Sequence, residues 1–213
     1  MQYNSKNPEN SNDKLSQDTL PTGFQRDRVV FLDRDGVINH DSDDYIKSWS
    51  EFTFIPRSIE AIHQLVRHGY SVIVITNQSV INRNMVSYKN LNYIHDMMKK
   101  AVENKGGRII DIFFCPHIPE NNCTCRKPKP GLIHQAQSKY NIHLNTAVMI
   151  GDNAKDIECA KNAGCKGILV KTGNAKQALT TLKDKHVHPD HIAKDLYEAV
   201  QWILSHKGNN GFI

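Results

Sequence analysis

The chain has 213 residues, of which 39% are hydrophobic and 23% charged, and its formal net charge is +5. This length and apolar content suit one globular domain with a sizeable core, and no apolar run approaches the roughly 20 residues of a membrane-spanning helix. The mild positive charge suits a phosphorylated substrate or weak nucleic-acid contact and does not decide between them.

The N-terminal segment, residues 1–24, is rich in Asn, Ser, Lys and Asp and contains no apolar stretch. This composition predicts a disordered tail, so we expect a single domain over residues 25–213. Because the segment does not have the pattern of a secretory signal, we expect a cytoplasmic location. The five cysteines are an odd number, and a reducing compartment disfavours a disulfide framework.

Short apolar runs rich in β-branched residues alternate with helical patterns along the rest of the chain. The predicted strands span residues 29–32, 71–76, 109–114, 147–150 and 167–170. Four of these runs are nearly all apolar, as in parallel strands that are covered on both faces. The first run is followed at once by "DRDG", which places Asp33 and Asp35 directly after a core strand.

Helical patterns follow most of the strands. They cover residues 56–69, 87–107, 131–141, 153–164 and 194–208. In the first of them, Ile59, Ile62 and Leu65 share one face and Gly69 marks the end. The alternation predicts an α/β fold: a three-layer, Rossmann-like open sheet of mainly parallel strands with helices on both faces. The gaps between the elements leave no room for a separate cap domain.

Polar residues follow three of the predicted strands. Asp33 and Asp35 come after the first, Thr76 and Asn77 end the second, and Asp152 follows the fourth. Any one of these residues alone suits a turn or a helix cap. Ligands of open parallel sheets bind beyond the carboxyl ends of the strands, so three polar groups in register indicate a binding site.

The set of polar residues matches the requirements of phosphoryl transfer. A carboxylate can attack phosphorus and form an acyl phosphate, and a divalent cation such as Mg²⁺ lets the two anions approach. A second acid can protonate the leaving oxygen and later deprotonate water, while a hydroxyl and a lysine hold the remaining oxygens. The residues that supply these parts are Asp33, Asp35, Thr76, Lys127 and Asp152.

Four short segments, "FLDRDGV", "VITNQS", the lysine of "CRKPKPG", and "MIGDNAKD", resemble the four motifs of the haloacid dehalogenase-like superfamily. The resemblance covers roughly residues 28–172. It implies that Asp33 is the nucleophile, that Asp35 is the acid/base, and that Thr76 and Lys127 stabilise the phosphoryl group. Asp156 would orient Lys127 or the waters of the metal. The implied Mg²⁺ ligands are Asp33, the backbone carbonyl of Asp35, and Asp152.

The stretch "CPHIPENNCTCRKP" predicts a zinc site. Its four soft ligands are Cys115, His117, Cys123 and Cys125. A set filled by protein ligands leaves no open position, so we expect a structural Zn²⁺. The alternatives are two disulfides or unrelated surface cysteines, but Cys-x-Cys spacing strains a disulfide. Cys159 and Cys165 lie outside the motif and suit small core positions.

This zinc loop resembles two capless branches of the superfamily. One branch is the D-glycero-D-manno-heptose 1,7-bisphosphate 7-phosphatases of ADP- or GDP-heptose and lipopolysaccharide biosynthesis, and the other is the histidinol-phosphate phosphatases. "DYIKSWSEFTFIP" and "RKPKPG" favour the heptose branch, whereas the short spacer before Cys123 favours the histidinol branch. We expect the heptose branch. The candidate substrate contacts are Asp41, Tyr45, Asn77, Gln78, Ser79, Arg83, Arg126 and Asn153.

Two other functional classes stay open. An open site also suits a nucleic-acid 3′-phosphatase, although the chain has no strong basic run. A non-enzymatic, zinc-stabilised binding module would leave Asp33, Asp35 and Lys127 without a task. His186, His188 and His191 could bind metal, but a solvated loop before the last helix fits Pro189 better. We expect a monomer that acts on a small phosphorylated sugar, with no membrane or nucleic-acid partner.

Overall fold

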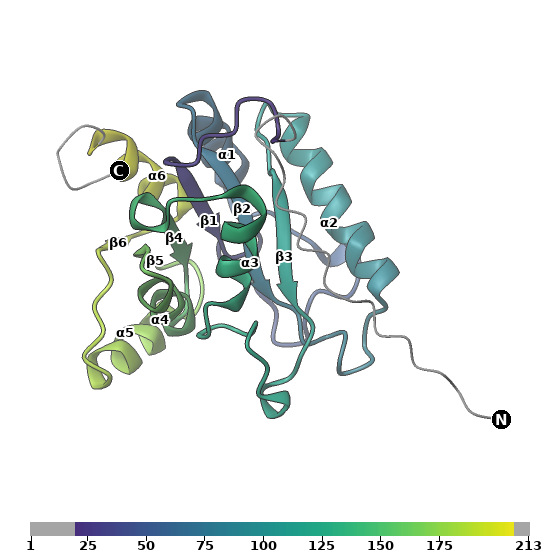
Figure 1. Ribbon diagram of the computed structural model, residues 1–213. Coiled ribbons are helices and arrows are strands. Elements are labelled where there is room, and N and C mark those ends of the chain that lie inside the picture. The colour runs from purple at the N-terminus through teal and green to yellow at the C-terminus, as the bar shows by residue number, and fades with distance from the viewer. Residues whose placement is uncertain (1–19, 207–213) are drawn as a thin grey trace.

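The computed structural model describes residues 20–206, and its centre is a six-stranded sheet (Figure 1). The strands are β1 (Val29–Leu32), β2 (Ser71–Asn77), β3 (Asp111–Cys115), β4 (Val148–Gly151), β5 (Lys166–Val170) and β6 (His191–Ala193). They pair in the order β3-β2-β1-β4-β5-β6, and every pairing is parallel. The sequence-based fold prediction is confirmed.

Helices cover both faces of the sheet and complete three layers (Figure 1). They are α1 (Ser58–Arg67), α2 (Tyr88–Glu103), α3 (Gly131–Tyr140), α4 (Ala154–Ala163), α5 (Ala175–Asp184) and α6 (Leu196–Ser205). One core cluster joins α1, α2 and α6 to the sheet, and a second cluster joins α3 and α4 to its other face. Within residues 20–206, no helix is long and apolar enough to cross a membrane.

The central strands are buried because helices cover both of their faces. All four residues of β1 are fully buried, with Val30 and Leu32 facing one core cluster and Val29 and Phe31 the other. Such a strand needs apolar side chains at every position, which explains the unbroken apolar run in the sequence. The register then carries the ends of β1, β2 and β4 to one edge of the sheet.

Two elements were not predicted. Helix α5 was overlooked although Ala175, Ala178 and Leu182 share one buried apolar face at helical spacing, so its signal was present in the sequence. Strand β6 has only three residues and begins at His191. The expectation of a solvated loop is therefore wrong at this histidine, whose ring stacks on Trp202 with centroids 4.2 Å apart.

The segment between β1 and α1 is a short flap and not a cap domain. An isolated bridge joins Asn39 to Phe54, and the rings of Trp49, Phe52 and Phe54 pack against one another. The only regular element of the flap is the 3₁₀ turn Trp49–Glu51. The predicted absence of a cap is confirmed for the described part of the chain.

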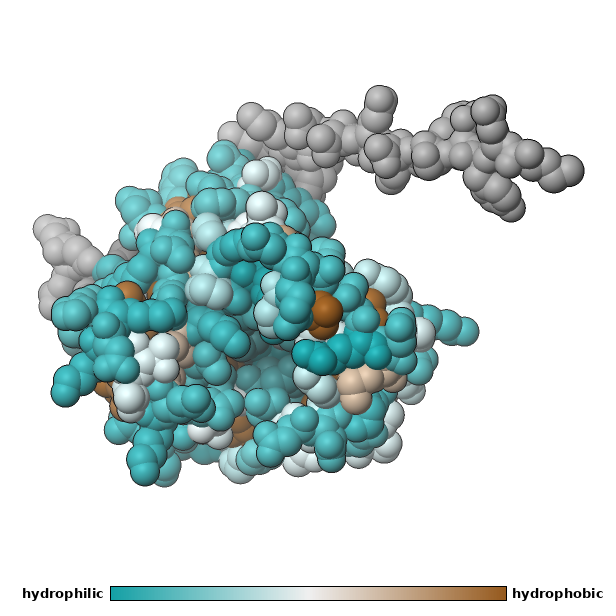
Figure 2. All heavy atoms as spheres, turned by 90° about the horizontal axis from the view of Figure 1, so that it is seen from below, coloured by the Kyte–Doolittle hydropathy of each residue, from teal (hydrophilic) through white to brown (hydrophobic). Residues whose placement is uncertain are grey.

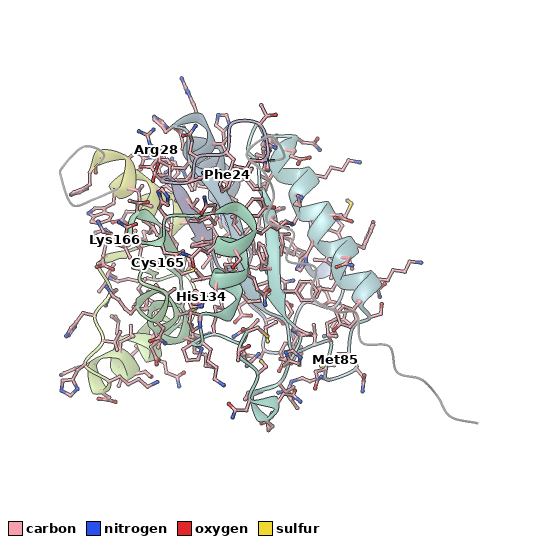
Figure 3. The ribbon with its side chains drawn as sticks, viewed as in Figure 1. Phe24, Arg28, Met85, His134, Cys165 and Lys166 are labelled. Carbon is pink, nitrogen blue, oxygen red and sulfur yellow. The ribbon has the colours of Figure 1, made fainter. Side chains whose placement is uncertain are left out.

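The described chain begins against the second core cluster. Leu20 packs on this cluster, and the Phe24 ring stacks on Tyr140 with centroids 5.2 Å apart. Phe24 lies at the end of the molecule opposite to Met85 (Figure 3). Packing therefore begins before the predicted boundary at residue 24, and the prediction for residues 1–19 lies outside the described range.

Candidate active site

The carboxyl ends of the strands surround a cavity of about 320 Å³. Figure 2 views the molecule from below and shows hydrophilic side chains around a hollow on this face. Every residue predicted for catalysis, substrate contact or Mg²⁺ binding lines this one cavity. Residues that are far apart in the sequence therefore meet here, in keeping with the edge rule for parallel sheets, by which ligand sites lie beyond the carboxyl ends of the strands.

The loop after β1 carries two carboxylates past a tight turn. Gly36 has a φ of +79°, a conformation that favours glycine. A Cβ at this position would lie 2.5 Å from the carboxylate of Asp152, so only glycine lets the two loops approach. Asp33 and Asp152 are in this way held on neighbouring strand ends.

Lys127 contacts two carboxylates of the site, and its side chain is almost completely buried. Its Nζ lies 2.9 Å from Asp33 Oδ2 and 2.6 Å from Asp156 Oδ1, and it donates to the carbonyl of Ile75 at 2.9 Å. Asp156 is fixed in turn, because its Oδ2 accepts from the backbone N–H of Asn153 in a capping box of α4. The ammonium therefore lies between two carboxylates, beside the predicted nucleophile.

The pKa values show an excess of buried negative charge. Burial raises the pKa of Asp33 well above its usual range, with Asp156 and Asp152 adding to the shift and Lys127 opposing it. Burial likewise raises the pKa of Asp152 to about 7. Burial alone would lower the pKa of Lys127, but Asp156 and Asp33 raise it above its usual value. One lysine does not neutralise three carboxylates, so the site favours a further cation.

The donor set fits a hard divalent cation. Oxygens of Asp33, Asp152 and Asp156 all lie within 4.8 Å of one another. Carboxylate oxygens are the ligands that Mg²⁺ takes in proteins. Asp152 is oriented for this task, because its Oδ2 accepts from the backbone N–H of Asn174 at 2.9 Å, and Gly173 leaves no room for a Cβ beside it.

The Asp35 carboxylate accepts hydrogen bonds from three side chains. Arg34 forms a fork on its carboxylate, with Nη2 at 2.8 Å from both oxygens. The amides of Asn39 and Gln78 donate to the same carboxylate, each at 2.8 Å. Burial alone would raise the pKa of Asp35, but Arg34, Asn39 and Gln78 hold it below its usual range. Its orientation is therefore fixed from three sides.

The loop after β2 contacts both Asp35 and Lys127. Gln78 Nε2 donates to Thr76 Oγ1 at 3.0 Å as well as to Asp35. The side-chain amide of Asn77 accepts from the backbone N–H of Lys127 at 3.1 Å and donates to the carbonyl of the same residue at 3.3 Å. Asn77 lines the cavity and its hydrogen bonds go to the lysine backbone, while its predicted contact with substrate stays a prediction.

The mouth of the cavity is lined by polar groups from several loops. The Arg83 guanidinium lies over the Tyr45 ring at 5.8 Å, which joins the β2 loop to the flap. Burial, together with nearby Asp35, raises the pKa of Asp41 on the same flap. Arg126 donates to the carbonyl of His117 at 3.0 Å. These groups can offer hydrogen bonds and charge to a polar substrate.

The predicted zinc ligands form one cluster at the end of β3 and in the loop that follows it. Cys125 Sγ lies 3.3 Å from Cys115 Sγ, 3.4 Å from Cys123 Sγ and 3.3 Å from His117 Nδ1. Four soft donors around tetrahedral Zn²⁺ at about 2.3 Å would be separated by about 3.8 Å, so the cluster fits this ion. All four donors come from protein, which leaves no position for a reacting water.

Several cavity residues escaped the sequence analysis. Arg34, Lys155 and Asn174 line the cavity, and the Thr172 hydroxyl donates to the carbonyl of Gly36. Thr172 and Asn174 lie in the loop after β5, which ends at Val170, so the edge rule applied to this fifth strand would have found them. The fork from Arg34 to its own neighbour has no signal in the sequence, because side chains of adjacent residues usually diverge.

Known proteins are similar to this chain. A family model described as HAD-hydrolase-like matches residues 124–199. D-glycero-beta-D-manno-heptose-1,7-bisphosphate 7-phosphatase of Pseudomonas aeruginosa is 44% identical over 71% of this chain and 85% of its own length. The chain belongs to this family of HAD-like phosphatases. The relative of the same name from Neisseria meningitidis serogroup A is 40% identical over 83% of this chain and 95% of its own length.

Solved structures of the family agree with the fold. The crystal structure of D,D-heptose 1,7-bisphosphate phosphatase from B. bronchiseptica, complexed with magnesium and phosphate, has a TM-score of 0.79 and 36% identity. It covers 84% of this chain and 99% of its own. The corresponding enzyme from Burkholderia thailandensis has a TM-score of 0.64 and 30% identity, with the same two coverages. The resemblance inferred from the four motifs is confirmed.

Proposed function

We propose that the protein removes the 7-phosphate of D-glycero-D-manno-heptose 1,7-bisphosphate, with Asp33 as nucleophile and Mg²⁺ as cofactor. The observation that carries the proposal is the contact of Lys127 with both Asp33 and Asp156, at the carboxyl end of β1. This arrangement offers an attacking carboxylate, a fixed positive charge and acidic metal ligands within one cavity. The printed substrate of the family members supports the choice of sugar.

In the first half of the reaction, an Asp33 oxygen forms a bond to phosphorus while the bond to the sugar oxygen breaks. Arg34 and the two amides keep the pKa of Asp35 low in the free protein, and the negative charge of the bound phosphate raises it, so that Asp35 can take up a proton and give it to the departing oxygen. Thr76 and Lys127 hold the phosphoryl oxygens as charge moves onto them. In the second half, Asp35 takes a proton from water, and the water oxygen displaces Asp33 from phosphorus.

Asp33, Asp152 and the Asp35 carbonyl are the proposed Mg²⁺ ligands, and Asp156 lies close enough to join them or to hold a bound water. When bound, Mg²⁺ would neutralise charge between the carboxylate and the phosphoryl oxygens. The four residues of the cysteine and histidine cluster would hold a structural Zn²⁺ that fixes the loop before Lys127. Function as a monomer in the cytoplasm stays a prediction.

The test is a phosphate-release panel with purified protein and Mg²⁺. It compares heptose 1,7-bisphosphate with fructose 1,6-bisphosphate, histidinol phosphate and an oligonucleotide that carries a 3′-phosphate. We expect the highest kcat/KM on the heptose bisphosphate. A higher value on histidinol phosphate or on the oligonucleotide would replace the proposed substrate and leave the reaction type in place.

A further inference from the structure

Arg34 is almost completely buried, which is unusual for a charged side chain. Only 1% of it is exposed, and it is the largest fully buried side chain among the described residues. Its Nε and Nη2 both contact the carboxylate of Asp35, at 2.8 to 3.0 Å. Nη1 takes no part in this fork, and its donors need another partner, because a buried donor without an acceptor is costly.

The partner of Nη1 is His95 on helix α2, whose Nε2 lies 3.3 Å away. A guanidinium has only donors, so Nε2 must be the acceptor and the ring proton must sit on Nδ1. Burial lowers the pKa of His95 to about 3, and the charge of Arg34 adds to the shift. The imidazole is therefore neutral at physiological pH, and its lone pair is available to the arginine.

The surroundings fix both partners. His95 is 4% exposed, and its ring meets Phe114 edge to face with centroids 5.6 Å apart. The guanidinium also lies 6.0 Å from the ring of Phe52 in the flap. Arg34 is thus held between α2 and the flap, with its fork on the Asp35 carboxylate.

We propose that His95 is a positioning residue of the phosphatase reaction: it fixes Arg34, and Arg34 fixes the Asp35 carboxyl that protonates the leaving oxygen. The inference rests on the proposed function, in which Asp35 is the acid. When the bond from phosphorus to the leaving oxygen breaks, the proton of Asp35 moves to that oxygen. Arg34 then stabilises the carboxylate that remains.

The experiment compares two leaving groups. An alkyl phosphate leaves as an alkoxide that needs a proton, whereas p-nitrophenyl phosphate leaves as a stable phenolate. The parameter kcat/KM covers only the steps up to departure of the leaving group, so the later hydrolysis of phosphorylated Asp33 does not enter it. The alkyl substrate is the one in the panel that the wild-type protein hydrolyses fastest.

His95→Leu, which has no acceptor for Arg34, should lower kcat/KM for the alkyl phosphate on the order of tenfold. The aryl phosphate should lose less than about threefold, because its leaving group needs little acid catalysis. His95→Gln, whose amide oxygen can accept from Arg34, should recover part of the loss. Asp35→Asn should show the same selectivity more strongly, and Val102→Ala, two turns further along α2, should show none.

The inference would be overturned if Asp35→Asn is selective for the alkyl phosphate but His95→Leu lowers kcat/KM equally on both substrates, or on neither. If the leucine variant does not fold, Arg34→Lys serves instead, because a lysine cannot form the fork. An unselective Arg34→Lys would also overturn the inference. Failure of the wild-type protein to hydrolyse either substrate would overturn the proposed function, and the inference with it.

Discussion

The side-chain amide of Asn77 forms two hydrogen bonds with the backbone of Lys127, accepting from its N–H at 3.1 Å and donating to its carbonyl at 3.3 Å. These bonds join the end of β2 to the loop that carries Cys125, one of the predicted zinc ligands. A lysine on a loop can place its ammonium reproducibly only if its backbone is fixed. Asn77 therefore links the sheet to the charge that faces Asp33.

Asn77→Ala removes both bonds and should lower kcat on the order of tenfold, because small displacements of a catalytic group are costly. Asn77→Asp keeps the acceptor for the lysine N–H and should lie between alanine and wild type. Asn162→Ala is the matched control, since Asn162 donates to the carbonyl of the next residue, Pro128, at 3.0 Å. Steady-state kinetics that give Asn77→Ala and Asn162→Ala the same kcat would refute the role of Asn77 in positioning Lys127.

Mg²⁺ affinity should depend on pH through Asp152. Its pKa, about 7 as a result of burial, means that the folded protein holds a proton that the unfolded chain releases at about pH 3.9. The metal-free protein therefore loses stability as pH rises between these values. Because protons compete with the metal, affinity should rise with pH up to about 7 and then level off.

Calorimetric titration of Mg²⁺ between pH 5 and 8 checks this expectation, together with melting temperatures with and without the ion. The gain in Tm from Mg²⁺ should be larger at pH 8 than at pH 5. An affinity that stays constant over this range would show that Asp152 is already ionised in the metal-free protein.

The cysteine and histidine cluster should bind one zinc ion per chain in protein purified without chelator. Cys123→Ser should lower Tm and raise KM, with some hydrolysis surviving at high Mg²⁺, because the zinc shapes the loop and does not react. Cys165→Ala, which removes a buried thiol outside the cluster, should keep its zinc. A Cys123→Ser protein with normal Tm and KM but no kcat would indicate a catalytic zinc.

Much of the fold and of the site follows from the sequence, for identifiable physical reasons. Strands β1 and β2 are covered on both faces, so their apolar runs mark them clearly, and the edge rule then places Asp33, Thr76 and Asp152 together. Strand β6 was missed because an edge strand of three residues needs no apolar run. The contact between His95 and Arg34 was missed because it joins residues 61 positions apart with no motif around the histidine.

The boundaries were less predictable than the elements. The third strand was expected at residues 109–114 and lies at Asp111–Cys115, where its pairing with β2 carries Cys115, the first predicted zinc ligand, to the end of the strand. Hydrogen bonds to the neighbouring strand decide where pairing ends, and the hydropathy of a single segment does not contain them.

Replacement of Asp33 should abolish the reaction. Asp33→Asn should lower kcat by on the order of 10⁴-fold or more, as expected when a nucleophile is removed, since an amide does not attack phosphorus. The protein should stay folded, because Lys127 keeps its contacts with Asp156 and with the carbonyl of Ile75. Circular dichroism and phosphate release together check this, and a folded variant with wild-type rates would remove Asp33 from the mechanism.

The most direct test of the aspartyl-phosphate mechanism is the intact mass of Asp35→Asn after mixing with Mg²⁺ and p-nitrophenyl phosphate, whose leaving group needs little acid catalysis. Without Asp35 to activate water, the phosphoryl group should stay on the enzyme. The predicted result is a mass increase of one phosphoryl group, located by peptide mapping on the segment that contains Asp33 and absent from Asp33→Asn. Phosphate release by Asp35→Asn at the wild-type rate, or a phosphoryl group on any other residue, would contradict the account.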